Sequence, residues 1–190
     1  MVVALTGASG VIYGTRLVEE LLKRDFEVHL IISEPAKIVI EQELNWEFTN
    51  SVEETFKKYF PSANLFLYDN SNIAAPIASG SFLVDSMVVI PCTMSTVSNI
   101  AHGTSKNLLE RAADVIIKER RQLVIVPRET PLSSIHLKNM LVLSDLGVHI
   151  VPAMPAFYHQ PKDINDMVNF VVGKVLDVLR VEHDIYNRYQ

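Results

Sequence analysis

An arginine and a glutamate stand side by side between two prolines in the segment Pro127–Pro131. They directly follow the apolar stretch Leu123–Val126, which predicts a strand. The Arg128 guanidinium can grip a phosphate or a ring oxygen, and the Glu129 carboxylate can move a proton. The pair indicates phosphate or acid–base chemistry, and the alternative interpretation is a structural ion pair.

A glycine-rich turn, Thr6–Gly10, follows the first apolar stretch, and Gly14 lies in the helix beyond it. Glycines let a backbone approach a ligand, and the N-terminus of the following helix offers N–H groups to an anion. The spacing fits neither the dinucleotide fingerprint GxGxxG nor the hydrolase elbow GxSxG. The turn therefore predicts a phosphate or nucleotide site, unless it is only a tight strand-to-helix connection.

Hydroxyl side chains cluster after the strand expected at Met87–Ile90, which Pro91 is expected to close. Four of them fall within Thr93–Ser98, at the start of a predicted helix. They can form a phosphate cradle, although N-capping alone needs one of them. Cys92 is more typical of a small buried hydrophobic residue than of a nucleophile.

Two cations, Arg111 and Lys118, lie seven residues apart on one predicted helix and so share a face. A ligand site and a solvated, salt-bridged surface are both open for them. Glu43, on the helix after the second strand, is either solvated or turned toward a site.

An NAD-binding domain would place an acid where Ser33 ends the second strand, although Glu34 follows it directly. Tyr158 and Lys162 have the spacing of a dehydrogenase pair, but Pro161 between them disfavours a helix. The loop from residue 152 to 163, with Phe157–His159 in it, is either a cover for an apolar ligand or a structural crossover. The histidines show no metal-ligand spacing, so we expect no metal site.

The elements that must position these residues alternate between short apolar strands and longer helices. Continuous apolar strands separated by helices predict an α/β fold in which a parallel sheet is covered on both faces. Such sheets bind ligands at the carboxyl ends of their strands. The expected strands are 2–5, 28–32, 65–68, 87–90, 123–126 and 148–151, and the expected helices begin near residues 11, 34, 52, 94, 106, 132 and 163.

The chain has 190 residues, a net charge of −5 and one cysteine. This length predicts a single domain over residues 1–190, and the acidic balance disfavours nucleic acid and anionic membranes as partners. One cysteine excludes an internal disulfide framework, and no apolar stretch has the length of a membrane span. We therefore expect a cytoplasmic protein.

Four segments together resemble the UbiX-type flavin prenyltransferases: TGASGVIYG, PIASGS, ERAADVIIKERRQLVIVPRETPLSSIHLKNM and PAFYHQP. The similarity runs from about Val3 to Arg180. It implies a Rossmann-like three-layer α/β/α domain with a mostly parallel sheet, in a homo-oligomer that is typically a dodecamer. The last helix, about residues 163–180, is then expected at a subunit interface.

The resemblance also implies the reaction. The family joins a dimethylallyl group from dimethylallyl phosphate to N5 and C6 of reduced FMN, and a UbiD-type decarboxylase uses the product, as in ubiquinone biosynthesis. Glu129, Ser9 and Glu43 are the implied catalytic residues. The implied flavin contacts are Gly7, Ala8, Ser9, Ser33, Thr93, Met94, Ser95, Thr96 and Arg128. The implied contacts of the prenyl phosphate and reaction pocket are Arg111, Lys118, Tyr158 and Lys174, some of them across a subunit interface.

Two positions depart from the family pattern. Lys174 stands where an arginine commonly holds the prenyl phosphate, which keeps the charge and loses the bidentate fork. Ile73 replaces an aromatic residue that some members place beside the prenyl pocket. The alternatives to prenyl transfer are an FMN-dependent cysteine decarboxylase, which would carry PASANT where this chain reads PIASGS, and a non-catalytic flavin-binding protein.

Overall fold

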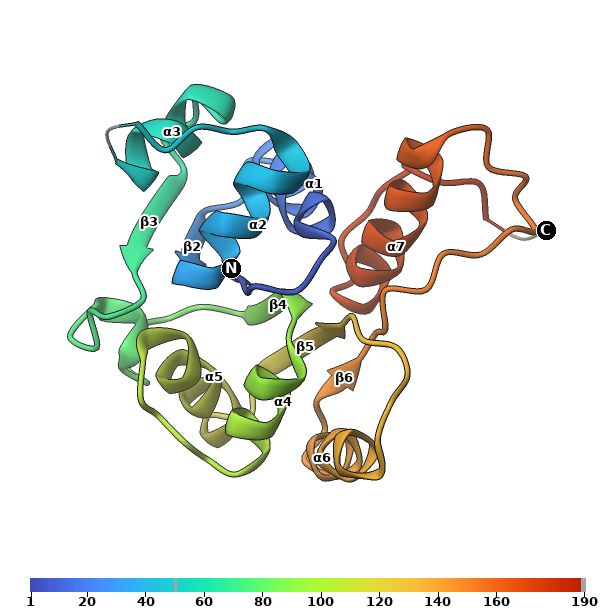
Figure 1. Ribbon diagram of the computed structural model, residues 1–190. Helices are drawn as coiled ribbons and strands as arrows, with labels where there is room; N and C mark the ends of the chain where they lie inside the picture. The colour runs from blue at the N-terminus through green and yellow to red at the C-terminus, as the bar shows by residue number, and fades with distance from the viewer. Residues whose placement is uncertain (50, 189–190) are drawn as a thin grey trace.

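The computed structural model describes residues 1–49 and 51–188, in which one six-stranded sheet runs through the centre of the molecule (Figure 1). All strands pair in parallel, in the order β3-β2-β1-β4-β5-β6. The strands are β1 (Val2–Leu5), β2 (Val28–Ile32), β3 (Leu65–Asp69), β4 (Ser86–Cys92), β5 (Gln122–Pro127) and β6 (His149–Ile150).

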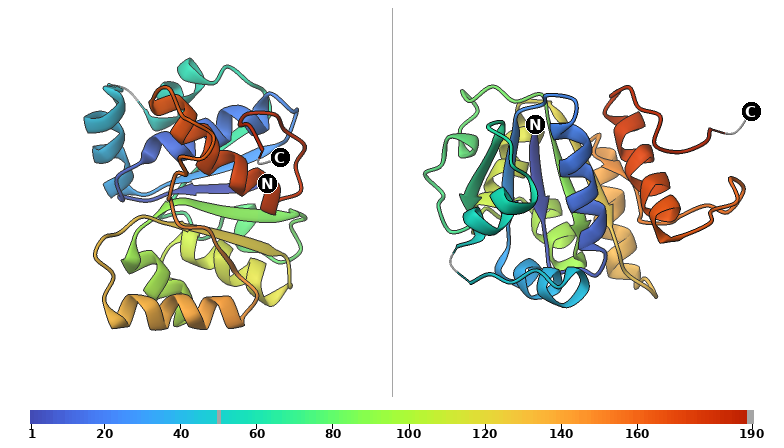
Figure 2. Two further views of the ribbon diagram at one scale, coloured as in Figure 1. Left: turned by 90° about the vertical axis from the view of Figure 1, so that its right-hand side faces the viewer. Right: turned by 90° about the horizontal axis from the view of Figure 1, so that it is seen from above.

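Helices cover both faces of the sheet, which confirms the three-layer α/β/α class expected from the sequence (Figure 2). One face carries α1 (Val11–Leu22), α2 (Glu34–Leu44), α3 (Val52–Tyr59) and α7 (Ile164–Val178). The other carries α4 (Met94–Ala101), α5 (Leu108–Lys118) and α6 (Ser134–Asp145). A short 3-10 turn, η1 (Pro76–Ala78), precedes β4 and was not anticipated from the sequence.

The central strands are apolar throughout because both of their faces are covered. Every residue of β1, β2 and β4 is buried. Alternate residues point to opposite faces, so Val3 and Leu5 join the cluster under α1 while Val2 and Ala4 join the cluster under α4 and α5. This arrangement fixes the register of the strands, and with it the positions of the residues that follow them.

The prediction that Pro91 closes the fourth strand is wrong. Strand β4 continues through Pro91 to Cys92, which pairs with Pro127. The pairing with β5 shifts register between Val89 and Cys92, and this irregularity accommodates a residue that has no N–H to donate.

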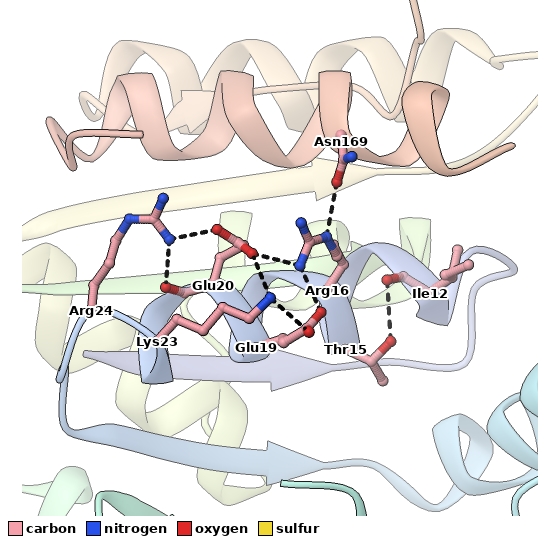
Figure 3. A network of polar contacts seen from close by, with 8 residues as sticks. All are labelled: Ile12, Thr15, Arg16, Glu19, Glu20, Lys23, Arg24 and Asn169. Atoms are coloured by element: carbon pink, nitrogen blue, oxygen red, sulfur yellow. Dashed lines mark hydrogen bonds and ion pairs between the residues drawn. The ribbon is translucent and has the colours of Figure 1, made fainter. Parts of the chain in front are cut away.

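A network of charged side chains ties α7 to α1 (Figure 3). The Glu20 side chain is only 4% exposed and forms ion pairs with Arg16, Lys23 and Arg24. Arg16 Nε also donates to Asn169 Oδ1 of α7 at 2.8 Å. This network therefore helps to hold the last helix against the first.

No helix in residues 1–49 and 51–188 is long and apolar enough to cross a membrane.

Candidate active site

Thr6 ties together the carboxyl ends of β1 and β4, the two strands at the centre of the sheet. Its hydroxyl donates to Pro91 O at 2.8 Å and accepts from Thr93 N at 2.9 Å. The residue is 2% exposed. It therefore holds the glycine turn and the start of α4 in fixed relation to one another.

The glycines in and after the first turn are each needed for a different physical reason. A Cβ atom at Gly7 would collide with Pro35 at the start of α2, and Gly10 has a φ of 98°, which side chains disfavour. A Cβ at Gly14 would collide with Ile90 O, so this glycine lets α1 lie directly on β4. Ala8 is buried and Ser9 is exposed, which leaves the Ser9 side chain at the rim.

The expectation that the N-terminus of α1 offers its amides to a ligand anion is wrong at Gly10 and Val11. Both carboxylate oxygens of Glu43 accept from Gly10 N, at 3.0 and 2.9 Å, and one accepts from Val11 N at 3.1 Å. The carboxylate supplies the negative charge that a helix N-terminus favours. Glu43 is exposed, as the solvated interpretation expects, and its carboxylate also reaches the glycine turn.

Hydroxyl groups cap α2 and α4 at the same end of the sheet. Ser33 caps α2 by accepting from Ala36 N at 3.3 Å, and Thr93 caps α4 by accepting from Thr96 N at 3.2 Å. The hydroxyls of Thr93 and Thr96 lie 2.9 Å apart. Ser95 is exposed, so α4 begins with hydroxyl groups facing outward beside amides that have no partner within the helix.

Two side chains in this segment point inward. Met94 is 7% exposed and belongs to the core. Cys92 is fully buried, and burial raises the pKa of its thiol far above the usual range. The thiol is inert, as the sequence interpretation expected.

Arg128 and Glu129 line a cavity of about 460 Å³ between the end of β5, α6 and the segment after β6. Arg128 Nε is buried without a hydrogen-bond partner among the described residues. Glu129 is exposed, and its Oε1 accepts from Thr130 N at 3.0 Å. The two side chains form no ion pair with each other in the described residues, which disfavours the structural interpretation of this pair.

A buried guanidinium N–H without a partner requires an acceptor from outside the chain segment that surrounds it. The ring oxygens and phosphate of a flavin nucleotide are such acceptors. The donors at this edge of the sheet therefore fit a bound flavin nucleotide.

Sequence reasoning passed over Tyr13. Its ring lies over Gly10, where a Cβ would come within 2.8 Å of it. Burial raises the pKa of Tyr13, the Glu43 carboxylate raises it further, and the Arg128 guanidinium opposes both. The hydroxyl therefore stays protonated near both charged groups. A tyrosine one turn after a glycine turn was the signal that could have found it.

Arg111 and Lys118 share one face of α5, as predicted, and both are paired on the helix surface, Arg111 with Asp114 at 2.8 Å and Lys118 with Glu119 at 2.6 Å, which fits the salt-bridged interpretation. Arg111 Nε donates to Ala78 O at 3.2 Å, and the Lys118 side chain lies against Gly80. Helix α5 ends at Lys118, beside the start of β5, whereas Arg128 follows the end of that strand. The six residues of β5 span roughly 20 Å, so Lys118 lies near the amino end of this strand and Arg128 follows its carboxyl end.

Tyr158, in the segment before α7, and Lys174, on α7, form a third group. The Tyr158 ring packs edge-on against Phe170 at 5.8 Å between centroids, and Lys174 follows Phe170 by one helical turn. Residues 158–163 are not helical, which confirms the argument from Pro161. Ile73 is 61% exposed.

The candidate residues thus fall into three groups within one chain. The carboxyl edge of the sheet brings together the glycine turn, Ser33, Glu43, the start of α4 and the Arg128–Glu129 pair. Lys118 lies at the other end of β5, Arg111 contacts η1, and Tyr158 packs against α7, the helix that carries Lys174. In the described residues no cluster of three or more histidine, cysteine or acidic side chains could hold a metal ion.

A three-layer fold with an all-parallel sheet in the order 3-2-1-4-5-6, and an unpaired donor beside its carboxyl edge, is typical of nucleotide-binding α/β proteins of the Rossmann-like class. The comparisons narrow this class. Residues 1–176 match the model of the Flavoprotein family. The chain is 52% identical over 191 residues to the flavin prenyltransferase UbiX of Alkalihalophilus pseudofirmus, covering 100% of this chain and 95% of that protein.

Solved structures agree with the sequence match. A dodecameric FMN-dependent UbiX-like decarboxylase from Escherichia coli O157:H7 is 44% identical, with a TM-score of 0.89 over 100% of this chain and 98% of that chain. AnUbiX (PadA1), solved in complex with FMN and dimethylallyl pyrophosphate, is 37% identical, with a TM-score of 0.88 over 100% of this chain and 96% of that chain. The chain belongs to the UbiX flavin prenyltransferase family.

Proposed function

We propose that this protein transfers a dimethylallyl group from dimethylallyl phosphate to N5 and C6 of reduced FMN. The observation that carries the proposal is the buried, unpartnered Arg128 Nε beside Glu129, at the rim of a cavity of about 460 Å³. The relatives named above support both the flavin and the prenyl donor. Reduced FMN, when bound, supplies the nucleophilic atoms.

The carboxyl edge of the sheet would hold the flavin. Gly7, Ala8 and Ser9, together with Ser33 and the segment Thr93–Thr96, offer amides and hydroxyls to it. Arg128 would donate from Nε to a flavin acceptor. Much of the rate would then come from holding two reactants in stacked contact.

Proton movement is assigned to the carboxylates. Glu129 is exposed at the rim, where it can take a proton from the reacting ring and pass it to solvent. Ser9 assists near N5. Glu43 contributes by fixing the turn that carries Ser9, since it holds Gly10 N and Val11 N.

The leaving phosphate needs its charge neutralised, and four donors are assigned to it: Arg111, Lys118, Tyr158 and Lys174. Because Lys118 lies at the other end of β5 from Arg128, we propose that these donors reach the flavin of another subunit. A homo-oligomer, a dodecamer as in the Escherichia coli relative, would then be required for activity.

Exposed apolar side chains support this assembly. Helix α6 leaves Ile135 at 67% and Leu141 at 61% exposure, on a helix that borders the Arg128 cavity. Such a surface is buried in subunit contacts more often than it is left in water. The outer side of α7 is proposed as a second contact.

The product would pass to a UbiD-type decarboxylase, as in ubiquinone biosynthesis, and the reaction would take place in the cytoplasm.

The test is to incubate the protein with reduced FMN and either dimethylallyl phosphate or dimethylallyl diphosphate, after exhaustive chelation, and to detect the adduct by mass spectrometry. We expect adduct with at least one donor and no requirement for Mg²⁺. Turnover of a peptidyl- or pantothenoyl-cysteine in place of adduct would instead indicate a cysteine decarboxylase. Bound flavin without any turnover would indicate a storage protein.

A further inference from the structure

The segment Glu182–Arg188, here called the C-terminal arm, folds back along α7 (Figures 1 and 2). The Glu182 carbonyl accepts from Arg24 Nε at 2.9 Å, and Ile185 packs against the core. The Tyr186 ring lies on Gly173, where a Cβ would collide with it. The arm is therefore packed onto the helix that carries Lys174.

Asp177 is the point on α7 where the arm is anchored. Tyr186 Oη donates to Asp177 Oδ2 at 2.7 Å, and Arg188 Nη2 pairs with Oδ1 at 2.6 Å. His183 Nε2 lies 3.0 Å from Oδ1. Burial alone would raise the pKa of Asp177, but these contacts outweigh it and lower the pKa to about 2. The carboxylate is thus ionised and saturated by the arm.

Lys174 is the weakest partner of the same carboxylate. Its Nζ lies 3.6 Å from Oδ2, the oxygen to which Tyr186 donates at 2.7 Å. The Lys174 side chain is 48% exposed, against 21% for Asp177. A lysine ammonium is a mobile point charge, so a carboxylate one turn away would hold it unless closer donors were already there.

We propose that Tyr186 and Arg188 are positioning residues: by occupying Asp177 they keep the Lys174 ammonium available for the phosphate of the prenyl donor. This inference rests on the proposed function, in which Lys174 contacts that phosphate. The arm reaches Tyr158 as well, because the Phe170 ring contacts the rings of both Tyr158 and Tyr186, at 5.8 and 5.2 Å between centroids.

The test starts from Tyr186→Phe, which keeps the ring on Gly173 and removes only the hydroxyl. Oδ2 then pairs with Lys174, so the KM for dimethylallyl phosphate rises roughly three- to tenfold, while kcat and the FMN Kd stay unchanged. Arg188→Gln, at a side chain 56% exposed, gives a change in the same direction without disturbing the core. Tyr59→Phe, on α3, is the matched control and leaves the KM unchanged.

Two double variants separate positioning from a purely structural effect. Adding Asp177→Asn to Tyr186→Phe restores the KM, because a neutral amide does not hold the ammonium. In a Lys174→Gln background, Tyr186→Phe has no further effect on the KM. If the arm had only a structural role, the KM of the Asp177→Asn and Tyr186→Phe double variant would rise further instead of recovering. Tyr186→Phe would then also raise the KM in the Lys174→Gln background.

The failure of this inference differs from the failure of the proposed function. If the wild-type protein forms adduct and the KM of Tyr186→Phe is unchanged, or Asp177→Asn worsens it, the positioning role is wrong and the prenyl transfer stands. If the wild-type protein forms no adduct with either donor, the proposed function itself is wrong.

Discussion

Two clusters of charged side chains differ in whether their buried groups have partners within the chain. In the α1–α7 network, the buried Glu20 carboxylate is matched by Arg16 of α1 and by Lys23 and Arg24, which directly follow the end of that helix (Figure 3). At the end of β5, Arg128 Nε is buried with no partner in the described residues, and Glu129 reaches the surface beside it.

This difference distinguishes charged side chains that stabilise the fold from charged side chains that are available to bind a ligand. A buried charged or polar group is costly unless it is paired, so a network completed within the chain is explained by stability alone. A network completed within the chain does not explain an unpaired donor that lines a cavity, which is the arrangement expected of a ligand-binding group. Mutations in the two clusters should therefore affect different measurements.

The largest effect is expected from Glu129→Gln. The amide keeps the shape and loses the ability to accept a proton, so adduct formation slows by about 10²- to 10⁴-fold, while FMN still binds. Single-turnover mass spectrometry gives the rate, and flavin fluorescence titration gives the affinity. Wild-type turnover in this variant would remove Glu129 from the mechanism.

Glu20→Gln should act on stability instead. It leaves three cations around a neutral amide and costs about 2–3 kcal/mol of the free energy of unfolding, below the range for fully buried pairs because the cations reach solvent. Urea denaturation measures this cost. Glu19→Gln, at a carboxylate 41% exposed, is the matched control with a cost below about 1 kcal/mol. A comparable loss of FMN affinity in Glu20→Gln would contradict the separation.

Arg128→Gln should weaken FMN binding roughly ten- to a hundredfold, the equivalent of one hydrogen bond to a charged group. Its free energy of unfolding should not fall, because the variant removes an unpaired buried donor. Isothermal titration with FMN and urea denaturation test the two statements together. Destabilisation of the protein without a change in FMN affinity would show that Arg128 stabilises the fold and does not bind the flavin.

The smallest effect is a pH dependence. Burial alone would raise the pKa of Glu20, but the hydrogen bond from Arg24 and the charges of Arg16 and Lys23 lower it below its usual range. Its contribution is therefore full above the unfolded pKa of about 4.3 and is lost as the pH falls through the lower folded value. The free energy of unfolding of Glu20→Gln should fall less than that of the wild type below pH ~4. If the free energy of unfolding of the two proteins falls in parallel with pH, Glu20 is not the source of the pH dependence.

The sequence predicted the strands and helices well because the core strands are continuous apolar runs and the helices carry ordinary caps. It could not show that β4 continues through Pro91, since that depends on a register shift against β5. It also could not show that Glu43 reaches the start of α1 from 33 residues away. Both are tertiary arrangements.

For the candidate site, the order of residues after strands was sufficient to bring the glycine turn, Ser33, Thr93 and Arg128 to one edge. Lys174 was linked to the site only through the resemblance, and the spacing of Arg111 and Lys118 left a ligand site and a salt-bridged surface equally open. The Asp177 cluster had no sequence signal, because its partners approach it only when the C-terminal arm folds back.

The most direct test of the account is a crystal structure of the protein with FMN. We predict an acceptor atom of FMN within 3.2 Å of Arg128 Nε, with Glu129 at the edge of the flavin ring and the Glu20 network unchanged. An Arg128 Nε that stays unpaired while FMN binds elsewhere would contradict the account.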